Sequence, residues 1–289
     1  FYVWDFSQRF AEEVIGDFLS EYAAGRTPNP CLRCNERIKF AALLEKGLAL
    51  GYDAVATGHY ARLVEREHGL ELRRARDTDK DQSYVLGVLD QRQLAHSLFP
   101  LGDSLKPQVR AEAAALGFAV AAKPDSNDIC FIPDGDTAGF LADKLGAAPG
   151  RIVDIAGNHL GEHQGTFRYT IGQRKGLNLG VPSVEGRPRY VVGIDPDARQ
   201  VTVGTLDDLV VDELHGIRPT WTSEPPRGRW RGKVQVRAHG EAMDAWIETR
   251  PDDVVMRLDS GCRGVAPGQY AVCYDGERVV GSSVISGAS

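Results

Sequence analysis

The sequence predicts an α/β domain followed by two smaller β-rich parts, and three observations lead to this fold class. Helix and strand signals alternate from the first residues to about residue 137, as in an open α/β sheet. Around residues 147–150 helical periodicity becomes scarce, and short runs of alternating polar and apolar residues replace it. A second set of such runs begins near residue 214 and continues to the end of the chain.

The composition is that of an ordinary globular protein. The 289 residues are 42% hydrophobic and 26% charged, and no apolar run in the sequence approaches the length of a membrane span. Five cysteines are an odd number for a disulfide framework, so we expect working thiols in a reducing, cytoplasmic setting. The net charge of −6 argues against binding of nucleic acid by bulk electrostatics, so such a partner would need a local basic surface.

The first part begins with an apolar run at residues 1–4, which predicts a strand. Since nothing precedes this strand, we expect a fragment that lacks an N-terminal part of its first domain. A helix is predicted at residues 10–22, and two prolines predict an extended loop at residues 27–35. The next helix should begin at Cys34 with Asn35 as its cap, so the helix dipole would favour the thiolate of Cys34.

A short apolar run at residues 53–57 predicts a buried parallel strand that stops at Gly58 and His59. Ligands bind beyond the carboxyl ends of such strands, so both residues are candidates for ligand contact. A strand-ending histidine that caps the backbone is an equal alternative for His59. The other elements expected here are the end of the preceding helix at Gly51, a polar hairpin at 62–76, helices at 91–98 and 109–116, a turn-rich loop at 123–128 and an apolar run at 129–132 that contains Cys130.

The two β-rich parts are predicted from short runs with period-two alternation, which turn residues separate. In the first part the runs lie at 152–155, 167–171, 190–194 and 201–203. In the second part they lie at 233–237 and 254–258, with a hairpin that turns at Asp275 and Gly276.

Cys31 and Cys34 form a C-x-x-C pair, for which several roles are open. Such a pair serves as half of a zinc site, as a thioredoxin-like redox pair or as iron–sulfur ligands. Zinc is disfavoured because the sequence has no second C-x-x-C. Two structural cysteines are a further alternative, although buried structural thiols rarely occupy a loop with two prolines. The position of Cys130 fits a core residue and a functional residue equally well. Cys262 and Cys273 are expected to be packing residues in the β-rich tail.

Two basic stretches are candidates for phosphate contact. The glycine-flanked loop at residues 172–176 contains Arg174 and Lys175, although most such loops are exposed turns. Residues 227–237 hold five basic side chains, some of which would share one strand face as a basic stripe suited to RNA, or simply as a polar face. Residues 80–82 alone indicate a solvated turn.

Several of these stretches together resemble the tRNA-specific 2-thiouridylase family, whose members thiolate the wobble uridine of certain tRNAs. The matching stretches run in order over nearly the whole chain, and the ordered set is specific although each stretch alone is weak. They are GRTPNP at 25–30, CN at 34–35, IKF at 38–40, ATGHY at 56–60, KDQSY at 80–84, KPQVR at 106–110, DS at 125–126, ICFI at 129–132, GEHQG at 161–165, GQRKGL at 172–177 and PGQ at 267–269.

The resemblance implies three domains. They are an adenine nucleotide alpha-hydrolase-like (PP-loop), Rossmann-like ATP-binding domain at 1–137, a small β-rich central domain at 138–210 and a C-terminal β-barrel that binds tRNA at 211–289. It also implies a sulfurtransferase that uses ATP and Mg²⁺. A cysteine desulfurase or a sulfur-relay protein would donate the sulfur, and tRNAs with Lys, Glu and Gln type anticodons would be the substrates.

The resemblance also implies roles for individual residues. Cys130 would carry the incoming sulfur as a persulfide, Cys34 would be the partner thiol, and a reductant would resolve a disulfide between them. ATP would turn the C2 oxygen of the uridine into a leaving group, and Gly58 falls at an ATP contact. The target base would be held by Asn29, Pro30 and Cys31. The implied tRNA contacts are His59, Lys80, Asp81, Gln82, Arg237, Ala238 and Gln269.

Three departures from the family pattern leave alternatives open. The chain lacks the Ser-Gly-Gly-Val-Asp-Ser loop with which the family begins, so it could be a tRNA-binding remnant that does not adenylate uridine. Cys31 stands where many members have Asp, so Cys31, Cys34 and Cys130 could hold a [4Fe–4S] cluster. Ala238 replaces a larger residue, often Tyr, which argues against base stacking there. A thiol–disulfide oxidoreductase that uses Cys31 and Cys34 alone is the last alternative.

Overall fold

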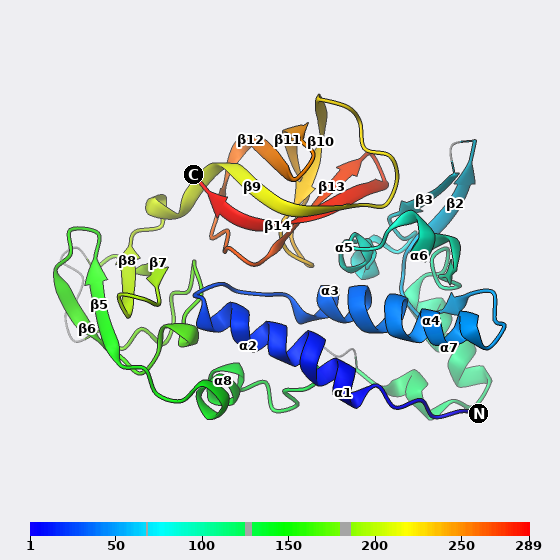
Figure 1. Ribbon diagram of the computed structural model, residues 1–289, viewed down its shortest axis with the longest axis horizontal. Coiled ribbons are helices and arrows are strands. Elements are labelled where there is room, and N and C mark those ends of the chain that lie inside the picture. Colours follow the sequence, from blue (N-terminus) through cyan, green and yellow to red (C-terminus); the bar gives the residue numbers. More distant parts are fainter. Residues whose placement is uncertain (68, 125–128, 180–185) are drawn as a thin grey trace.

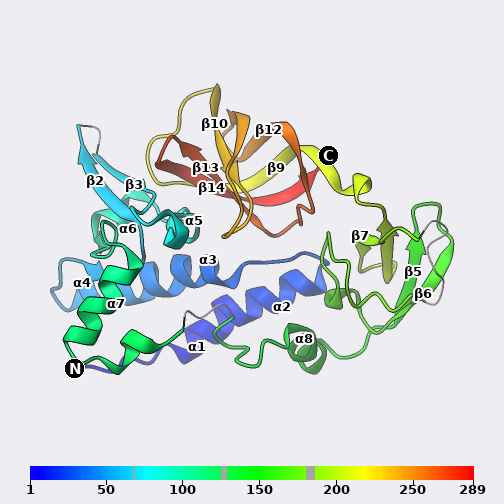
Figure 2. The same ribbon diagram turned by 180° about the vertical axis from the view of Figure 1, so that it is seen from behind.

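The computed structural model describes residues 1–67, 69–124, 129–179 and 186–289. Figure 1 shows long helices in one layer, a β-barrel packed above them and a smaller sheet beside them. The reverse view in Figure 2 shows the same arrangement, with the C-terminus at the barrel end nearest the small sheet. The Asp125-Ser126 stretch of the family resemblance lies outside the described residues.

The helices belong mainly to the first half of the chain. The α-helices of the described residues are α1 (Ser7–Phe10), α2 (Gly16–Ala23), α3 (Pro30–Cys34), α4 (Leu43–Ala49), α5 (Ser83–Leu86), α6 (Gln91–Ala95), α7 (Lys106–Ala115) and α8 (Thr137–Leu145). Two π-helical segments, Ala11–Ile15 and Asn35–Ala42, join α1 to α2 and α3 to α4 without a break. Short 3₁₀ turns lie at Thr78–Lys80, Ala119–Ala122, Thr166–Arg168 and Asp207–Leu209.

The helix that carries the cysteines begins earlier than predicted. Its first residue is Pro30, and the Asn29 side chain caps it by accepting a hydrogen bond from the Cys31 amide at 3.1 Å. The prediction of Asn35 as the cap is therefore wrong, because proline is well suited to the first helical turn, where its missing N–H is not needed. Asn35 is instead buried, and its side-chain amide donates to the Val85 carbonyl at 2.8 Å. The predicted end at Gly51 is confirmed by a left-handed φ of 84° there.

The other helix predictions are confirmed with shifted ends. The helix predicted at 10–22 lies within the continuous helical stretch from Ser7 to Ala23. The helix predicted at 91–98 stops at Ala95, since residues 97–98 form a strand. The helix predicted at 109–116 begins already at Lys106 and is followed by Gly117, whose φ is 77°.

The sheet of the first part is smaller than predicted. Strand β1 (Val55–Ala56) pairs in parallel with β4 (Ser97–Leu98), and no other described strand joins them. The buried strand predicted at 53–57 is therefore wrong in length, since only residues 55–56 are paired, and wrong in burial, since residues 53–57 are exposed or half-buried. The strand predicted at 1–4 is also wrong: its first three side chains are exposed and no described strand pairs with it.

The central part is a four-stranded sheet with the order β6-β5-β8-β7. Its strands are β5 (Gly150–Asp154), β6 (His159–His163), β7 (Tyr190–Asp195) and β8 (Gln200–Gly204). Three of the four predicted runs are confirmed, but residues 167–171 do not form a strand. Phe167 and Tyr169 point into different cores: Phe167 packs with Phe18 and Leu141, while Tyr169 packs with the sheet.

The C-terminal part is a closed six-stranded barrel, in which β13-β10-β11-β12-β9-β14 is closed by pairing of β14 with β13. Its strands are β9 (Val210–Trp221), β10 (Arg229–Gln235), β11 (Met243–Thr249), β12 (Asp253–Arg263), β13 (Tyr270–Asp275) and β14 (Arg278–Ala288). The predicted hairpin at Asp275 and Gly276 is confirmed. The polar hairpin, β2 (Arg62–Arg66) with β3 (Gly69–Arg73), is confirmed too and extends the barrel sheet through Arg73 and Arg278.

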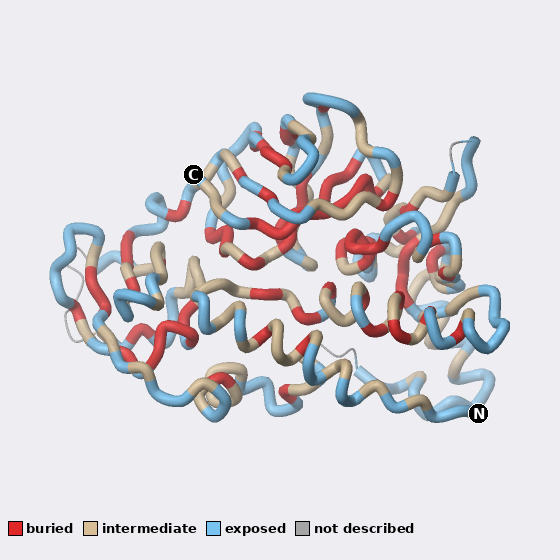
Figure 3. The backbone as a smooth tube through the Cα atoms, viewed as in Figure 1, coloured by how far each residue is buried: buried red, intermediate tan, exposed pale blue. Residues whose placement is uncertain are grey.

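The barrel and the cysteine helix share one hydrophobic core. Leu32 and Phe40 of that helix belong to the same buried cluster as Tyr270 and Val272 of β13. Figure 3 shows buried backbone where the barrel faces the helices, while the N-terminal end is exposed. Burial of the apolar surface, worth about 25 cal/mol per Å², thus fixes the barrel against the segment that carries Cys31 and Cys34.

Candidate active site

The loop before the cysteine helix is held by the barrel. The Thr27 amide donates to the Pro267 carbonyl at 2.8 Å, and the Gln269 side chain donates to the Thr27 carbonyl at 2.8 Å. Gly268 has a φ of 90°, and a Cβ there would lie 3.0 Å from the Arg26 Cβ, so only glycine permits this approach. Gln269, an implied tRNA contact, therefore anchors this loop in the structure.

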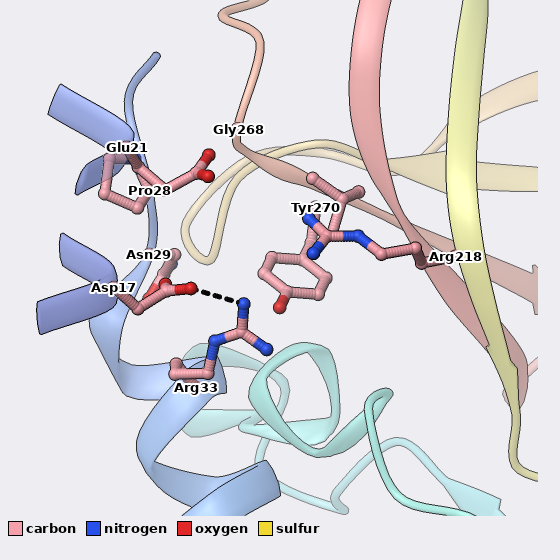
Figure 4. A pocket seen from close by; sticks show the side chains of 9 residues that line it. Asp17, Glu21, Pro28, Asn29, Arg33, Arg218, Gly268 and Tyr270 are labelled. Carbon is pink, nitrogen blue, oxygen red and sulfur yellow. Dashed lines mark hydrogen bonds and ion pairs between the residues drawn. The ribbon is translucent and has the colours of Figure 1, made fainter. Parts of the chain in front are cut away.

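Arg33, between the two cysteines, ties their helix to α2. Its guanidinium lies 2.6 Å from Asp17 and 2.9 Å from Glu36, with only 13% of the side chain exposed. Figure 4 shows Arg33 beside Tyr270, with the ion pair to Asp17. The sequence pattern does not single out Arg33, because its partner Asp17 lies 16 residues earlier on another helix.

The implied target-base residues differ in accessibility. Pro30 is buried, Asn29 is half-buried with its side chain used as the helix cap, and Cys31 is exposed. The cavity beside Asn29 measures about 10 Å³, which is the space of one water molecule. A base therefore does not fit in that cavity, and the exposed side of Cys31 is the accessible part of this loop.

The structure brings Cys31, Cys34 and Cys130 together. The Cys130 thiol lies close enough to raise the pKa of both other thiols. Cys130 is exposed on a turn, not a strand, and the neighbouring Phe131 fixes that turn by edge contacts with Phe10 and Phe18, at centroid distances of 5.9 and 5.3 Å. All five cysteines are free thiols. Cys273 is buried and Cys262 packs against the barrel core, as predicted.

The predicted low pKa of Cys34 is wrong. Burial raises the pKa of this thiol, and Cys130 and Cys31 raise it further. Cys34 lies five residues into the helix, beyond the free N–H groups on which the prediction depended. The opposing influence is the Lys39 ammonium, which lowers the pKa of Cys34 and of Cys31.

Lys39 is the second residue that the sequence analysis missed. It lies five positions after Cys34 in the π-helical segment Asn35–Ala42, where hydrogen bonds join residues five apart and bring such pairs onto one face. Its charge also acts on His59. Lys39 is therefore the cation that faces the thiols, and the sequence signal for it was the matched IKF stretch.

Gly58 and His59 follow β1, as predicted. Gly58 is exposed, whereas His59 is buried, with its Nδ1 2.8 Å from the Thr57 hydroxyl. Burial lowers the pKa of His59 to about 4, and Lys39 contributes to the shift. The imidazole is therefore neutral near pH 7 and packs against Phe40 and Phe99, which also contact each other.

Residues 80–82 support the fold as well as forming a turn. Asp81 accepts hydrogen bonds from the Ala75 amide and from the amide and hydroxyl of Ser83, and pairs with Arg74 at 2.9 Å. Gln82 exchanges two hydrogen bonds with the Tyr60 backbone. Lys80 and Gln82 are exposed, while the Asp81 side chain is 7% exposed. The prediction of a solvated turn is therefore wrong for Asp81, whose side chain holds residues 74, 75 and 83 in place.

Arg237 and Ala238 follow β10. Arg237 donates to the Gly264 carbonyl at 2.5 Å, and Ala238 packs against the shared core. The predicted basic stripe is confirmed only in part: Arg231 and Lys233 lie on one face of β10, Arg237 follows the strand, and the two stripe residues on β10 are paired with acids. Arg231 pairs with Asp259, and Lys233 with Asp244 at 3.5 Å.

The described residues provide no metal centre. Among residues 1–67, 69–124, 129–179 and 186–289, no three His, Cys, Asp or Glu side chains are arranged to hold a metal ion, so the three cysteines do not support the iron–sulfur alternative. His159 and His163 have H-x-x-x-H spacing, which the sequence analysis overlooked, but His163 faces the Arg199 carbonyl at 3.2 Å. In the described part of the chain, no helix is long and apolar enough to cross a membrane.

Comparison with known proteins covers the whole length of the chain. Family models match at residues 1–134 (tRNA methyl transferase HUP domain), 138–205 (tRNA methyl transferase PRC-barrel domain) and 211–285 (Aminomethyltransferase beta-barrel domain). The chain is 62% identical to the tRNA-specific 2-thiouridylase MnmA of Acidothermus cellulolyticus, with 99% of the chain and 79% of the relative aligned. The chain belongs to the tRNA-specific 2-thiouridylase family.

Other members of the family give the same result. The relatives of the same name from Cutibacterium acnes and Streptomyces coelicolor are 61% and 58% identical, with 99% of this chain aligned to 78% and 77% of theirs. The predicted HUP-type α/β domain followed by two β parts is confirmed by the models and by the closed barrel. Membership in the tRNA-specific 2-thiouridylase family disfavours an oxidoreductase that uses Cys31 and Cys34 alone.

Proposed function

We propose that the chain catalyses the ATP-dependent 2-thiolation of the wobble uridine of tRNA. The observation that carries this proposal is the proximity of two thiols from distant segments, the half-buried Cys34 and the exposed Cys130, with Lys39 acting on Cys34. Such a pair suits sulfur transfer, because one thiol can carry a sulfur atom and the other can release it by thiol–disulfide exchange. Family membership supports this assignment over an unrelated redox role.

The proposed roles follow from exposure and charge. Cys130, on an exposed turn, accepts sulfur from a donor protein and holds it as a persulfide, whose terminal sulfur attacks C2 of the uridine. The Cys34 thiolate then attacks the Cys130 sulfur, which releases the transferred sulfur on C2 and leaves a Cys34–Cys130 disulfide for a thiol reductant. Lys39 stabilises the Cys34 thiolate, since its charge lowers the pKa that burial raises.

ATP, when bound, supplies the adenylyl group that converts the C2 oxygen into a leaving group, which departs as AMP. Gly58 fits an ATP contact, because a Cβ there would meet only Leu101, at 3.8 Å, so packing does not require glycine at this position. It also follows β1 at the carboxyl edge of parallel strands, where ligands bind. We propose that Mg²⁺ accompanies the ATP phosphates.

We propose that the target base is bordered by Asn29, Pro30 and Cys31. We also propose that the protein surface that contacts tRNA includes His59, Lys80, Asp81, Gln82, Arg237, Ala238 and Gln269. For Asp81 and Gln269 the role would be indirect, because their hydrogen bonds within the protein hold neighbouring loops in place. The proposed domain limits are 1–137, 138–210 and 211–289. The proposed substrates are tRNAs with Lys, Glu and Gln type anticodons, and the proposed sulfur donor is a cysteine desulfurase or a sulfur-relay protein. The proposed location is the cytoplasm.

The test is mass spectrometry of the wobble uridine after incubation of tRNA with the chain, ATP and a sulfur source. We expect 2-thiouridine from the unchanged chain and none from Cys34→Ser or Cys130→Ser. Cys262→Ser is the matched control, because it removes a half-exposed thiol that lies in the barrel, and it should retain activity. Full activity of Cys130→Ser would exclude the two-thiol mechanism, and tRNA binding without thiolation would support a tRNA-binding remnant.

A further inference from the structure

Arg74, which follows β3, joins the first part of the chain to the barrel through both arms of its guanidinium. One terminal nitrogen, Nη1, lies 2.9 Å from the Asp81 carboxylate, and the other, Nη2, donates to the Gln235 side-chain oxygen at 3.0 Å. The central carbon of the guanidinium lies over the Tyr274 ring, 3.9 Å from its centroid. Only a quarter of the Arg74 side chain is exposed. The guanidinium is therefore held in one orientation by three groups from three different segments.

Each of the two polar partners of this guanidinium belongs to a turn that we assign to the tRNA surface. Gln235, at the end of β10, is only 4% exposed. Its side-chain NH₂ group donates to the Arg237 carbonyl at 2.9 Å and to the Ala238 carbonyl at 3.2 Å. Asp81 lies in the middle of the turn at residues 80–82, and its side chain is 7% exposed. One guanidinium therefore connects two turns from distant parts of the chain.

The guanidinium also decides which end of the Gln235 amide faces the barrel turn. Arginine has only hydrogen-bond donors, so it binds the amide through the amide oxygen. The NH₂ end is then left for the carbonyls of Arg237 and Ala238, which are acceptors. Without the guanidinium, a rotated amide would place its oxygen against these carbonyl oxygens with no hydrogen between them. The order of the barrel turn thus depends on Arg74.

The same hydrogen-bonded groups extend to the helix that carries Cys34. Ser83, whose amide and hydroxyl donate to Asp81, is the first residue of α5. The Val85 carbonyl of α5 accepts a hydrogen bond from the Asn35 side chain at 2.8 Å, and Asn35 directly follows Cys34. Figure 1 shows α5 beside the helix that carries Cys34. The two turns are thus held in a defined position relative to the thiols.

We propose that Arg74 is a positioning residue for the substrate tRNA, which sets the turn at residues 80–82 and the turn at residues 237–238 in one arrangement for contact with the RNA. This inference rests on the proposed function, since it takes tRNA as the substrate and these turns as its contacts. Arg74 acts through its partners, because both of its terminal nitrogens bind groups of the protein. Two turns that are already arranged lose less conformational entropy when the RNA binds. Lysine does not replace this arginine, because one ammonium lacks the planar fork that reaches both partners.

The test compares Arg74→Lys with Arg73→Lys in tRNA binding and in thiolation. Arg73 is the matched control, because its side chain is exposed to nearly the same extent, 26%, and its acidic partners are Glu71 and Glu277, outside both turns. We expect Arg74→Lys to weaken tRNA binding about 10-fold, the loss of one charge-assisted hydrogen bond. The KM for tRNA should rise equally while kcat stays within about twofold, because Arg74 does not touch the reacting atoms. Equal tRNA affinity in the two variants would overturn the proposal.

Gln235→Glu is a second variant that leaves Arg74 in place. The glutamate keeps an oxygen for the guanidinium but removes the NH₂ group that donates to the barrel turn. It should weaken tRNA binding about 10-fold as well, again with kcat within about twofold. If Arg74→Lys does not fold, Gln235→Glu decides alone, and an unchanged tRNA affinity in this variant would contradict the proposal.

A double-mutant cycle separates positioning from a merely structural role. If Arg74 acts by ordering the turn that carries Arg237, the loss of tRNA affinity in Arg74→Lys/Arg237→Gln should be smaller than the product of the two single losses. Losses that multiply would show that Arg74 acts independently of that turn, which would also overturn the proposal. If the unchanged chain neither binds nor thiolates tRNA, the proposed function itself fails, a result distinct from these.

Discussion

Replacement of Arg33 tests whether its ion pairs position the cysteine helix. Arg33→Ala removes a guanidinium whose side chain is 13% exposed and which lies 2.6 Å from Asp17 and 2.9 Å from Glu36. Both carboxylates are about three-quarters buried, so they would lose a partner and regain water only partly. Breaking a buried pair in this way lowers the free energy of unfolding by about 3–5 kcal/mol. Because these groups are still partly exposed, we expect a loss of about 3 kcal/mol.

The matched control is Arg37→Ala on the same helical stretch. Arg37 contacts the same carboxylate, Glu36, at 3.2 Å, but half of its side chain is exposed. An exposed pair contributes less than about 1 kcal/mol, and the change to alanine alters helix propensity equally in both variants.

Thermal unfolding measures the difference between the two variants. For a chain of this size, Tm should fall by roughly 6 °C for Arg33→Ala and by less than about 2 °C for Arg37→Ala. Alkylation of Cys34 by iodoacetamide should also become faster in Arg33→Ala, because the helix loses its tie to α2. Equal changes in Tm for the two variants would refute the reasoning, since burial would then not distinguish the two arginines.

Two further predictions concern groups near the thiols. Burial lowers the pKa of His59 to about 4 from its ordinary value of 6.5, so the unfolded chain binds more protons between these values and stability falls as pH drops through that window. His59→Asn should remove about 3 kcal/mol of this pH dependence in urea unfolding, and an unaltered pH profile would contradict it. Lys39→Gln should raise the pKa of Cys34 further and shift its alkylation profile to higher pH, as followed by peptide mass spectrometry. Buried Cys273 is the internal control that stays unmodified, and an unshifted profile would show that Lys39 does not act on Cys34.

Local features of the fold could be predicted because their signals lie within a few residues of one another. Helix ends at Gly51 and Gly117, the hairpin turn at Asp275-Gly276 and the change from helical to alternating patterns all have local causes. The same reasoning failed at Pro30, where a residue expected to exclude a helix starts one. It also failed at residues 1–4, since a strand requires a partner that local sequence does not specify.

The sequence by itself determined the family and the order of one α/β and two β parts, and it singled out Cys34 and Cys130 as the cysteines proposed to handle sulfur. The tertiary structure alone decided how those cysteines behave. The pKa of Cys34 depends on its burial, on the Lys39 charge and on Cys130, 96 positions away in the chain. The anchoring of its helix depends likewise on Asp17 and on the barrel residue Tyr270. Solvation and charge act through space, so neither could be obtained from spacing along the chain.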